Sequence, residues 1–144
     1  MNKIFNREIC VCAHVTQTRH AQKACAEMRG IMEQEIRLLC SGYSAETGSD
    51  LLAVKLFENT ETGEVHTEVT GGIRQGDSPS FSLLHGGFLY TVAELVGEKH
   101  AYIYQYRLSE DGIPVPTGKK IFLPGGELCH LYAGKKALYA SCYG

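Results

Sequence analysis

The pattern of apolar and polar positions divides the chain into a helical leader and a long series of strands. Between residues 16 and 36, apolar side chains recur at spacings of three and four, which predicts one buried helical face. Thr18 is a suitable N-cap, and Gly30 weakens the helix interior by roughly 1 kcal/mol. We therefore expect residues 1–35 to form a helical leader or extension. The apolar positions of this helix are Ala21, Ala24, Cys25, Met28, Ile31, Met32 and Ile36.

From residue 36 onward the pattern is typical of short strands separated by turns. Residues 64–69 alternate strictly, which indicates a half-buried strand of period two. Residues 101–108 contain three tyrosines and an isoleucine, which favour a strand, and are followed by the turn sequence Glu110-Asp111-Gly112. The other expected strands are residues 37–43, 51–57, 80–84, 88–94, 120–123, 128–133 and 137–143.

An internal repeat of about 49 residues organises these strands. Ser80-Phe81 aligns with Cys129-His130, Leu89-Tyr90 aligns with Leu138-Tyr139, and Gly63 lies one repeat before Gly112. Four short strands in a unit of this length are the signature of a β-propeller blade. We predict a mainly β fold, with about two blades of an incomplete β-propeller in residues 36–144, each blade an antiparallel four-stranded sheet.

The repeat also predicts how the ends are arranged. The first unit begins at its second strand, which in propellers pairs with the far terminus, and the last unit stops after its second strand. Complete rings have 4–8 blades. We therefore expect an N-terminal part of a ring, with exposed sheet edges through which copies self-associate.

Composition narrows the classes of function. The 14 basic and 16 acidic residues give a net charge of −2 without a basic run, which argues against nucleic-acid binding. No apolar window is long enough for a membrane helix, and we find no signal peptide, so we expect a cytoplasmic protein. The six cysteines are then interpreted as free thiols. Cys10, Cys12, His14, His20 and Cys25 lack the spacing of a zinc knuckle, so we expect no metal.

Six segments resemble the lactonase-type seven-bladed propeller family, which includes 6-phosphogluconolactonase and carboxymuconate-cyclase-like proteins. Leu128, Ala93 and Ser141-Cys142 depart from the family pattern, which has Pro, Asn and Ala-Asn there. The resemblance covers about residues 37–144 and leaves residues 1–35 outside it. The matching segments are Leu39–Tyr43, residues 51–63, Ser78–Phe81, Phe88–Glu94, Gly126–Leu131 and Leu138–Gly144.

The resemblance implies a reaction and its residues. It implies hydrolysis of a sugar-acid lactone or cyclisation of a carboxymuconate, without a cofactor, on a small lactone or carboxylate substrate. His130 is the candidate general acid–base, because an imidazole titrates near neutral pH. Glu94 is the candidate carboxylate that orients the histidine or binds substrate. The resemblance places the anion-binding arginine in later blades, so we expect residues 1–144 alone to be inactive.

Alternative interpretations stay open beside this one. His130 could instead be structural, Glu94 could form a strand-end ion pair, and Tyr43 and Tyr143 are interpreted as packing residues. Ser80 lacks the surroundings of a nucleophilic serine and is interpreted as part of a turn. As a whole, the chain could be a non-enzymatic binding or oligomerising module, because a fold does not fix a function.

Overall fold

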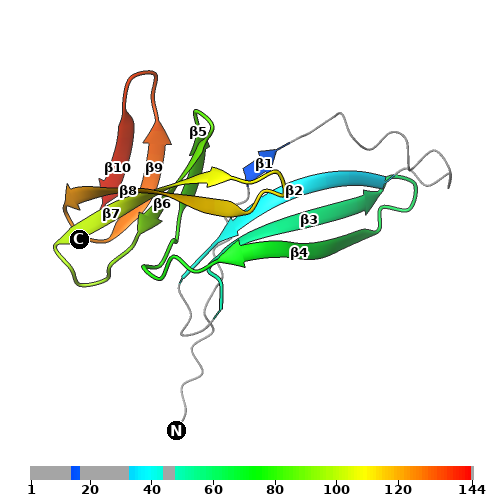
Figure 1. Cartoon of the computed structure of the whole chain (residues 1–144), viewed down its shortest axis with the longest axis horizontal. Helices are drawn as coiled ribbons and strands as arrows, with labels where there is room; N and C mark the ends of the chain where they lie inside the picture. Colours follow the sequence, from blue (N-terminus) through cyan, green and yellow to red (C-terminus); the bar gives the residue numbers. More distant parts are fainter. Residues whose placement is uncertain (1–13, 17–32, 44–47, 144) are drawn as a thin grey trace, which may run out of the picture.

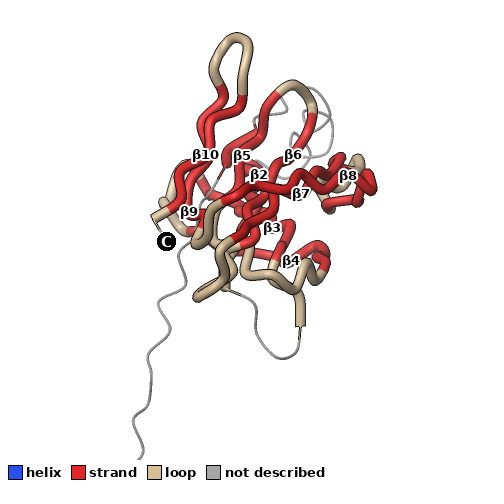
Figure 2. Tube along the Cα trace, turned by 90° about the vertical axis from the view of Figure 1, so that its left-hand side faces the viewer, coloured by secondary structure: helices blue, strands red, loops and turns tan. Residues whose placement is uncertain are grey.

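The computed structural model describes residues 14–16, 33–43 and 48–143, and all of its regular elements are strands (Figures 1 and 2). The first sheet has the order β1-β2-β3-β4, and the second has the order β5-β6-β7-β8. The third sheet is the hairpin β9-β10. All pairings are antiparallel. The strands are β1 His14–Thr16, β2 Glu33–Ser41, β3 Leu51–Asn59, β4 Val65–Ile73, β5 Ser82–His85, β6 Phe88–Ala93, β7 His100–Leu108, β8 Pro114–Pro124, β9 Leu128–Ala133 and β10 Leu138–Cys142.

Both described ends of the expected leader helix are strands. Thr16 lies in β1, and residues 33–36 begin β2, so the prediction of helix is wrong at these positions. The interior of that segment, residues 17–32, lies outside the described residues. The boundary placed between residues 35 and 36 therefore falls inside β2, where backbone pairing with β3 runs without a break from Glu33 to Ser41.

The first sheet contains a strand that the repeat did not predict. β1 pairs with β2 as β5 pairs with β6, so the first position of this sheet is filled from within the described chain. The expectation that the first unit begins at its second strand is wrong for this reason. His14, which was weighed as a zinc ligand, lies in β1 opposite Leu39.

The 49-residue periodicity is present in the strands themselves. β7 begins and ends 49 residues after β3, and β8 begins 49 residues after β4. The turns between these strands match as well. Gly63 and Gly112 have φ angles of 72° and 80°, and each donates its N–H back to a carbonyl near the end of the preceding strand. Glycine adopts this left-handed conformation at no steric cost, which explains its place in both turns.

The three sheets pack face to face in chain order, with two apolar clusters between them. Leu39 and Leu51 of the first sheet meet Leu89 and Tyr106 of the second. The opposite face of the second sheet contributes Val92, Ala101 and Ile103 to a cluster with Leu128 and Leu131 of the third. Alternate residues of β6 and β7 thus face different neighbours, so these two strands are covered on both sides, while the edge strand β8 is mostly exposed. Each fully buried leucine contributes about 1.5–3 kcal/mol of hydrophobic stabilisation.

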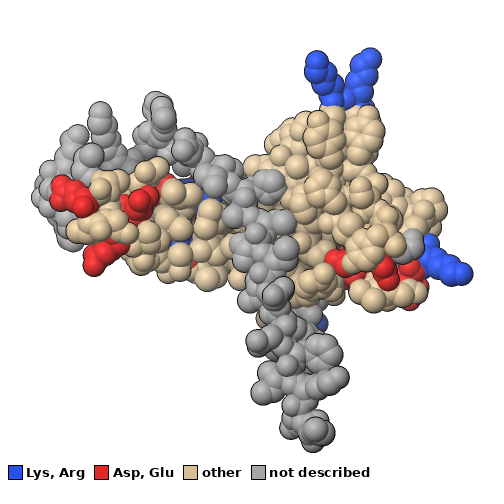
Figure 3. Space-filling model, turned by 180° about the vertical axis from the view of Figure 1, so that it is seen from behind, with Lys and Arg blue, Asp and Glu red and all other residues tan. Residues whose placement is uncertain are grey.

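Charged residues lie mostly away from these interfaces. Figure 3 shows acidic side chains gathered at the far end of the first sheet, where Glu58, Glu61, Glu64 and Glu68 surround the β3–β4 turn. Basic side chains project from the tip of the third sheet in the same view, and the β9–β10 turn contains Lys135 and Lys136. No helix among the described residues is long and apolar enough to cross a membrane.

Candidate functional site

A buried carboxylate lies where the chain leaves the middle of the three sheets. Glu94 directly follows β6, and only 5% of its surface is exposed. Its backbone N–H donates to the carbonyl of Ser78 at 3.2 Å, which ties the strand exit to the loop before β5. Its Oε1 atom accepts hydrogen bonds from the hydroxyls of Tyr143 at 2.7 Å and Tyr43 at 3.5 Å. The carboxylate is therefore held between two phenols.

The three residues occupy matching places in the three sheets. Tyr43 lies two residues after β2, Glu94 one residue after β6, and Tyr143 one residue after β10. The exits of the second strand of each repeat thus converge on one carboxylate. Tyr43 and Tyr143 are 50% and 65% exposed, so the interpretation of both as packing residues is wrong. Their hydroxyls reach the carboxylate while their rings stay in contact with solvent.

The acidic residues Glu94 and Glu127 shape the electrostatics of the strand exits. The hydrogen bond to Glu94 and the charge of its carboxylate raise the pKa of Tyr143 to about 12, with smaller contributions from Tyr43 and Glu127. The carbonyl of Glu127 accepts the Tyr143 N–H at 3.4 Å, so a second acidic residue borders the site. No lysine or arginine among the described residues forms an ion pair with Glu94. The side-chain groups that meet at these exits are one carboxylate and two phenol hydroxyls.

His130 lies in β9 of the third sheet and is exposed. Its ring packs beside Phe81, with 4.5 Å between the ring centroids and an interplanar angle of 47°. Within the described part of the chain, no hydrogen bond or ion pair joins His130 to Glu94. The structure therefore brings Glu94 together with the two tyrosines, and it leaves the predicted acid–base histidine without a direct link to the carboxylate.

Ser80, interpreted from the sequence as part of a turn, is buried in the segment that leads into β5. Its N–H donates to the Ser78 carbonyl at 2.7 Å, and Ser78 has a φ angle of 45°. The Ser80 hydroxyl finds no hydrogen-bond partner among the described residues. No histidine or carboxylate in this part of the chain bonds to it, so its surroundings are those of a turn and not of an activated nucleophile.

A polar network centred on Gln75 supports the strand exits. The Gln75 side chain donates to the Val92 carbonyl at 2.7 Å and accepts hydrogen bonds from the hydroxyls of Thr91 and, at 3.0 Å, Tyr106. Its backbone N–H donates to the Asp50 carboxylate at 2.7 Å. Gln75 thus connects the first sheet to the second. No local sequence pattern distinguishes a half-buried glutamine in such a network from a solvated one.

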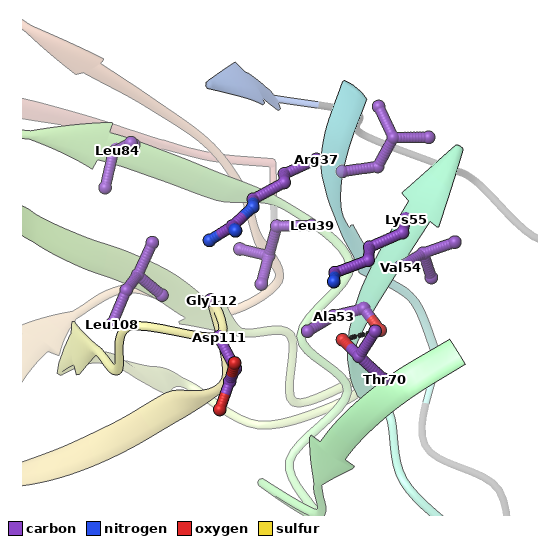
Figure 4. A pocket seen from close by; sticks show the side chains of 11 residues that line it. Arg37, Leu39, Ala53, Val54, Lys55, Thr70, Leu84, Leu108, Asp111 and Gly112 are labelled. Carbon is purple, nitrogen blue, oxygen red and sulfur yellow. Dashed lines mark hydrogen bonds between the residues drawn. The ribbon is translucent and has the colours of Figure 1, made fainter. Parts of the chain in front are cut away.

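A small pocket lies between the first two sheets, away from the strand exits (Figure 4). Arg37 and Lys55 project into it from β2 and β3, opposite Asp111 of the β7–β8 turn. Arg37 is already engaged, since it donates to the Glu110 carbonyl at 2.6 Å and pairs with Glu35 at 3.0 Å. Lys55 lies 3.8 Å from the other oxygen of Glu35. Glu35 thus pairs with both cations, and the Arg37–Glu110 hydrogen bond joins the first sheet to the β7–β8 turn.

The described cysteines and the possible metal ligands complete the description of reactive groups. Cys40, Cys129 and Cys142 are free thiols, as the sequence predicted for them, and Cys10, Cys12 and Cys25 lie outside the described residues. Within the described ranges, no group of three His, Cys, Asp or Glu side chains is placed to hold a metal ion.

Comparison with known proteins adds no assignment. No family model, no curated protein and no solved structure matches the chain.

Proposed function

We propose that the chain is part of a lactonase-type β-propeller that hydrolyses a sugar-acid lactone, with the strand exits around Glu94 as its sugar-binding side. The observation that supports this is the convergence of three equivalent strand ends on one carboxylate. In a propeller, matching strand ends of successive blades border the central channel, where ligands bind. The face-to-face packing of the three sheets in chain order is consistent with that arrangement.

The chemistry of the strand exits suits one part of the reaction. Glu94 accepts hydrogen bonds from neutral phenols, and the hydroxyls of a sugar lactone are donors of the same kind. Lactone opening also requires an activated water and a proton for the leaving alkoxide, and His130 is the proposed acid–base for both steps. The proposal requires the substrate or the β9–β10 hairpin to move, so that the bound lactone contacts both Glu94 and His130.

Binding and turnover of δ-gluconolactone test the proposal separately. We expect residues 1–144 to bind the lactone and to open it no faster than buffer, since the resemblance assigns the anion-binding arginine to later repeats. Binding is measured by ¹H–¹⁵N NMR titration, and opening by the acid released in a pH-stat. Glu94→Gln should weaken binding by about tenfold, the equivalent of one charge-assisted hydrogen bond of about 1.4 kcal/mol.

Glu68→Gln is the matched control, because Glu68 is exposed on β4 and far from the exits. It should bind the lactone as the unsubstituted chain does. An unsubstituted chain that shows no shifts with the lactone contradicts the proposal, as does a Glu94→Gln chain with unchanged affinity. A rate above the buffer rate would show instead that residues 1–144 already contain a complete lactonase site.

A second candidate function, a self-associating module, is favoured by the free edge of β10. The third sheet has two strands where the other two have four, and residues 138–142 contain neither proline nor charge. The edge strand β8, in contrast, contains three prolines and two lysines, which discourage pairing. We propose that β10 pairs with β10 of a second copy in an antiparallel, two-fold arrangement.

Light scattering coupled to size exclusion tests this second candidate. We expect a dimer that Ser141→Lys on β10 converts to a monomer, while Thr67→Lys on the edge strand β4 leaves the dimer intact. A monomer at every concentration, or equal effects of the two substitutions, would contradict pairing through β10.

A further inference from the structure

The third sheet places two free cysteines side by side across a bulge. Leu128 pairs with Cys142 and His130 pairs with Ser141, so Cys129 is an extra residue on β9 opposite the Ser141–Cys142 peptide. Without the bulge the register would continue with Cys129 directly opposite Cys142, and the two side chains would share one face of the hairpin. A bulged residue is released from strict alternation, which allows its side chain to turn across the pair.

Contacts of the two thiols show that they do turn toward each other's strand. The Cys129 thiol donates to the carbonyl oxygen of Ser141 at 3.4 Å, and that oxygen lies within about 3 Å of the Cα of Cys142 by standard peptide geometry. The Cys142 thiol donates to the carbonyl of Gly125 at 3.8 Å, at the base of β9. Directly opposite Cα atoms in an antiparallel pair lie about 4.5–5.5 Å apart, within the range of about 4.4–6.8 Å that a disulfide spans.

We propose that Cys129 and Cys142 form a dithiol site that a small-molecule disulfide, such as oxidised glutathione, converts to a cross-strand disulfide. One cysteine thiolate attacks the small disulfide, forming a mixed disulfide and releasing one glutathione thiol. The second cysteine then attacks the protein sulfur of the mixed disulfide and releases the second glutathione. Two protein thiols are thereby oxidised, and one glutathione disulfide is reduced to two thiols.

Solvent exposure and distance from the other described cysteine both favour oxidation of Cys129 and Cys142 with each other. Cys142 is exposed and Cys129 is partly exposed, so a small reagent reaches them. Cys40, the other described cysteine, lies in the first sheet, and the second sheet stands between it and the hairpin. The inference is independent of the proposed lactonase function, because it uses only the geometry of β9 and β10. The disulfide would also fix the residue that precedes Tyr143, and so connect the redox state to the Tyr143–Glu94 hydrogen bond.

The reaction rate should depend on pH. Burial, and then the nearby charge of Cys129, raises the pKa of the Cys142 thiol, so little thiolate is present at neutral pH. Because the thiolate is the attacking species, the rate should increase steeply as the pH rises from about 7 to about 9.

Peptide mapping of the oxidised full chain tests the proposal. Trypsin cleaves at Lys135 and Lys136, so the disulfide appears as peptide 121–135 linked to peptide 137–144. We expect this linked pair to dominate in the folded chain. The same linkage is also favoured in urea, because Cys142 is the cysteine nearest to Cys129 along the chain and closes the shortest loop. The comparison is therefore made on the ratio of linked peptide to glutathione adducts of the same two cysteines, which should be lower in urea, where strand pairing no longer holds the thiols together.

Substitutions decide whether the pair itself is responsible. Cys129→Ser and Cys142→Ser should each abolish the linked peptide, and Cys40→Ser should leave its yield unchanged. If the ratio of linked peptide to glutathione adducts is no higher in the folded chain than in urea, or if the folded chain mainly links either cysteine to another partner or to glutathione, the proposal is overturned.

Discussion

Replacing Gln75 with alanine removes the side chain that connects the loop before β5 to the middle sheet. Two buried hydroxyls then lose their acceptor, because Thr91 and Tyr106 both donate to the Gln75 Oε1 atom and are 0% and 3% exposed. Each unsatisfied buried donor costs about 1–3 kcal/mol. We expect Gln75→Ala to lower the free energy of unfolding by about 2–5 kcal/mol, a large part of the 5–15 kcal/mol typical of a domain.

The assay is urea unfolding followed by far-ultraviolet circular dichroism, with Gln34→Ala as the control. Gln34 is exposed on β2, so the same substitution there should change stability by less than about 0.5 kcal/mol. A double-substitution cycle isolates the network. In a Tyr106→Phe background one of the two donors is already absent, so Gln75→Ala should cost about 1–2 kcal/mol less than in the unsubstituted chain.

Either of two results would refute this reasoning. Equal effects of Gln75→Ala and Gln34→Ala would mean that the network contributes no stability. A full effect of Gln75→Ala in the Tyr106→Phe background would mean that the loss arises elsewhere, for instance from the Asp50 contacts of the loop backbone.

Two other predictions concern alkaline pH and a close backbone approach. Burial raises the pKa of Tyr106 to about 12, and Glu94 raises the pKa of Tyr143 to about 12. The stability that both tyrosines contribute is fully present below pH 10 and should be lost as the pH rises through 12, less steeply in Tyr106→Phe. Urea unfolding between pH 10 and 12 measures this loss, and a flat profile would contradict the prediction. A Cβ at Gly126 would lie 1.8 Å from the carbonyl oxygen of Glu98, so Gly126→Ala should lower the melting temperature strongly. The control is Gly76→Ala, where a Cβ meets no atom within 4 Å although the φ angle is 97°, and its effect should be far smaller. Similar melting temperatures for the two variants would show that the backbone moves apart freely at Gly126.

The strands that the sequence predicted best are those whose signals are local. β3 and β7 each combine an apolar run with a polar turn that ends in glycine, and the 49-residue spacing reinforces both. The strand β8 was underestimated, since only residues 120–123 were expected in place of Pro114–Pro124. Its exposed edge accepts prolines and polar residues that argue against a central strand.

The errors near the N-terminus have a physical origin in the periodicity itself. Apolar residues four apart, such as Met32 and Ile36, fit one face of a helix and one face of a strand equally well. Pairing with β3 from Glu33 onward decides in favour of the strand, and this pairing is a contact that no local window contains. β1 has three residues and is defined only by its register with β2, so its sequence carries too little pattern to be recognised.

The candidate site shows that the spacing of the repeat does not predict which residues lie close together in space. Tyr143 lies 49 residues after Glu94 and Tyr43 lies 51 residues before it, yet equivalence along a chain is different from proximity in space. Proximity arises because the sheets pack face to face through Leu89 and Leu131, which aligns three strand exits over one carboxylate. Residues just beyond a strand are also outside its in-and-out alternation, so the pattern that predicts packing says nothing about their direction. A repeat with matched polar residues at its strand ends therefore indicates a shared site only once the packing between repeats is known.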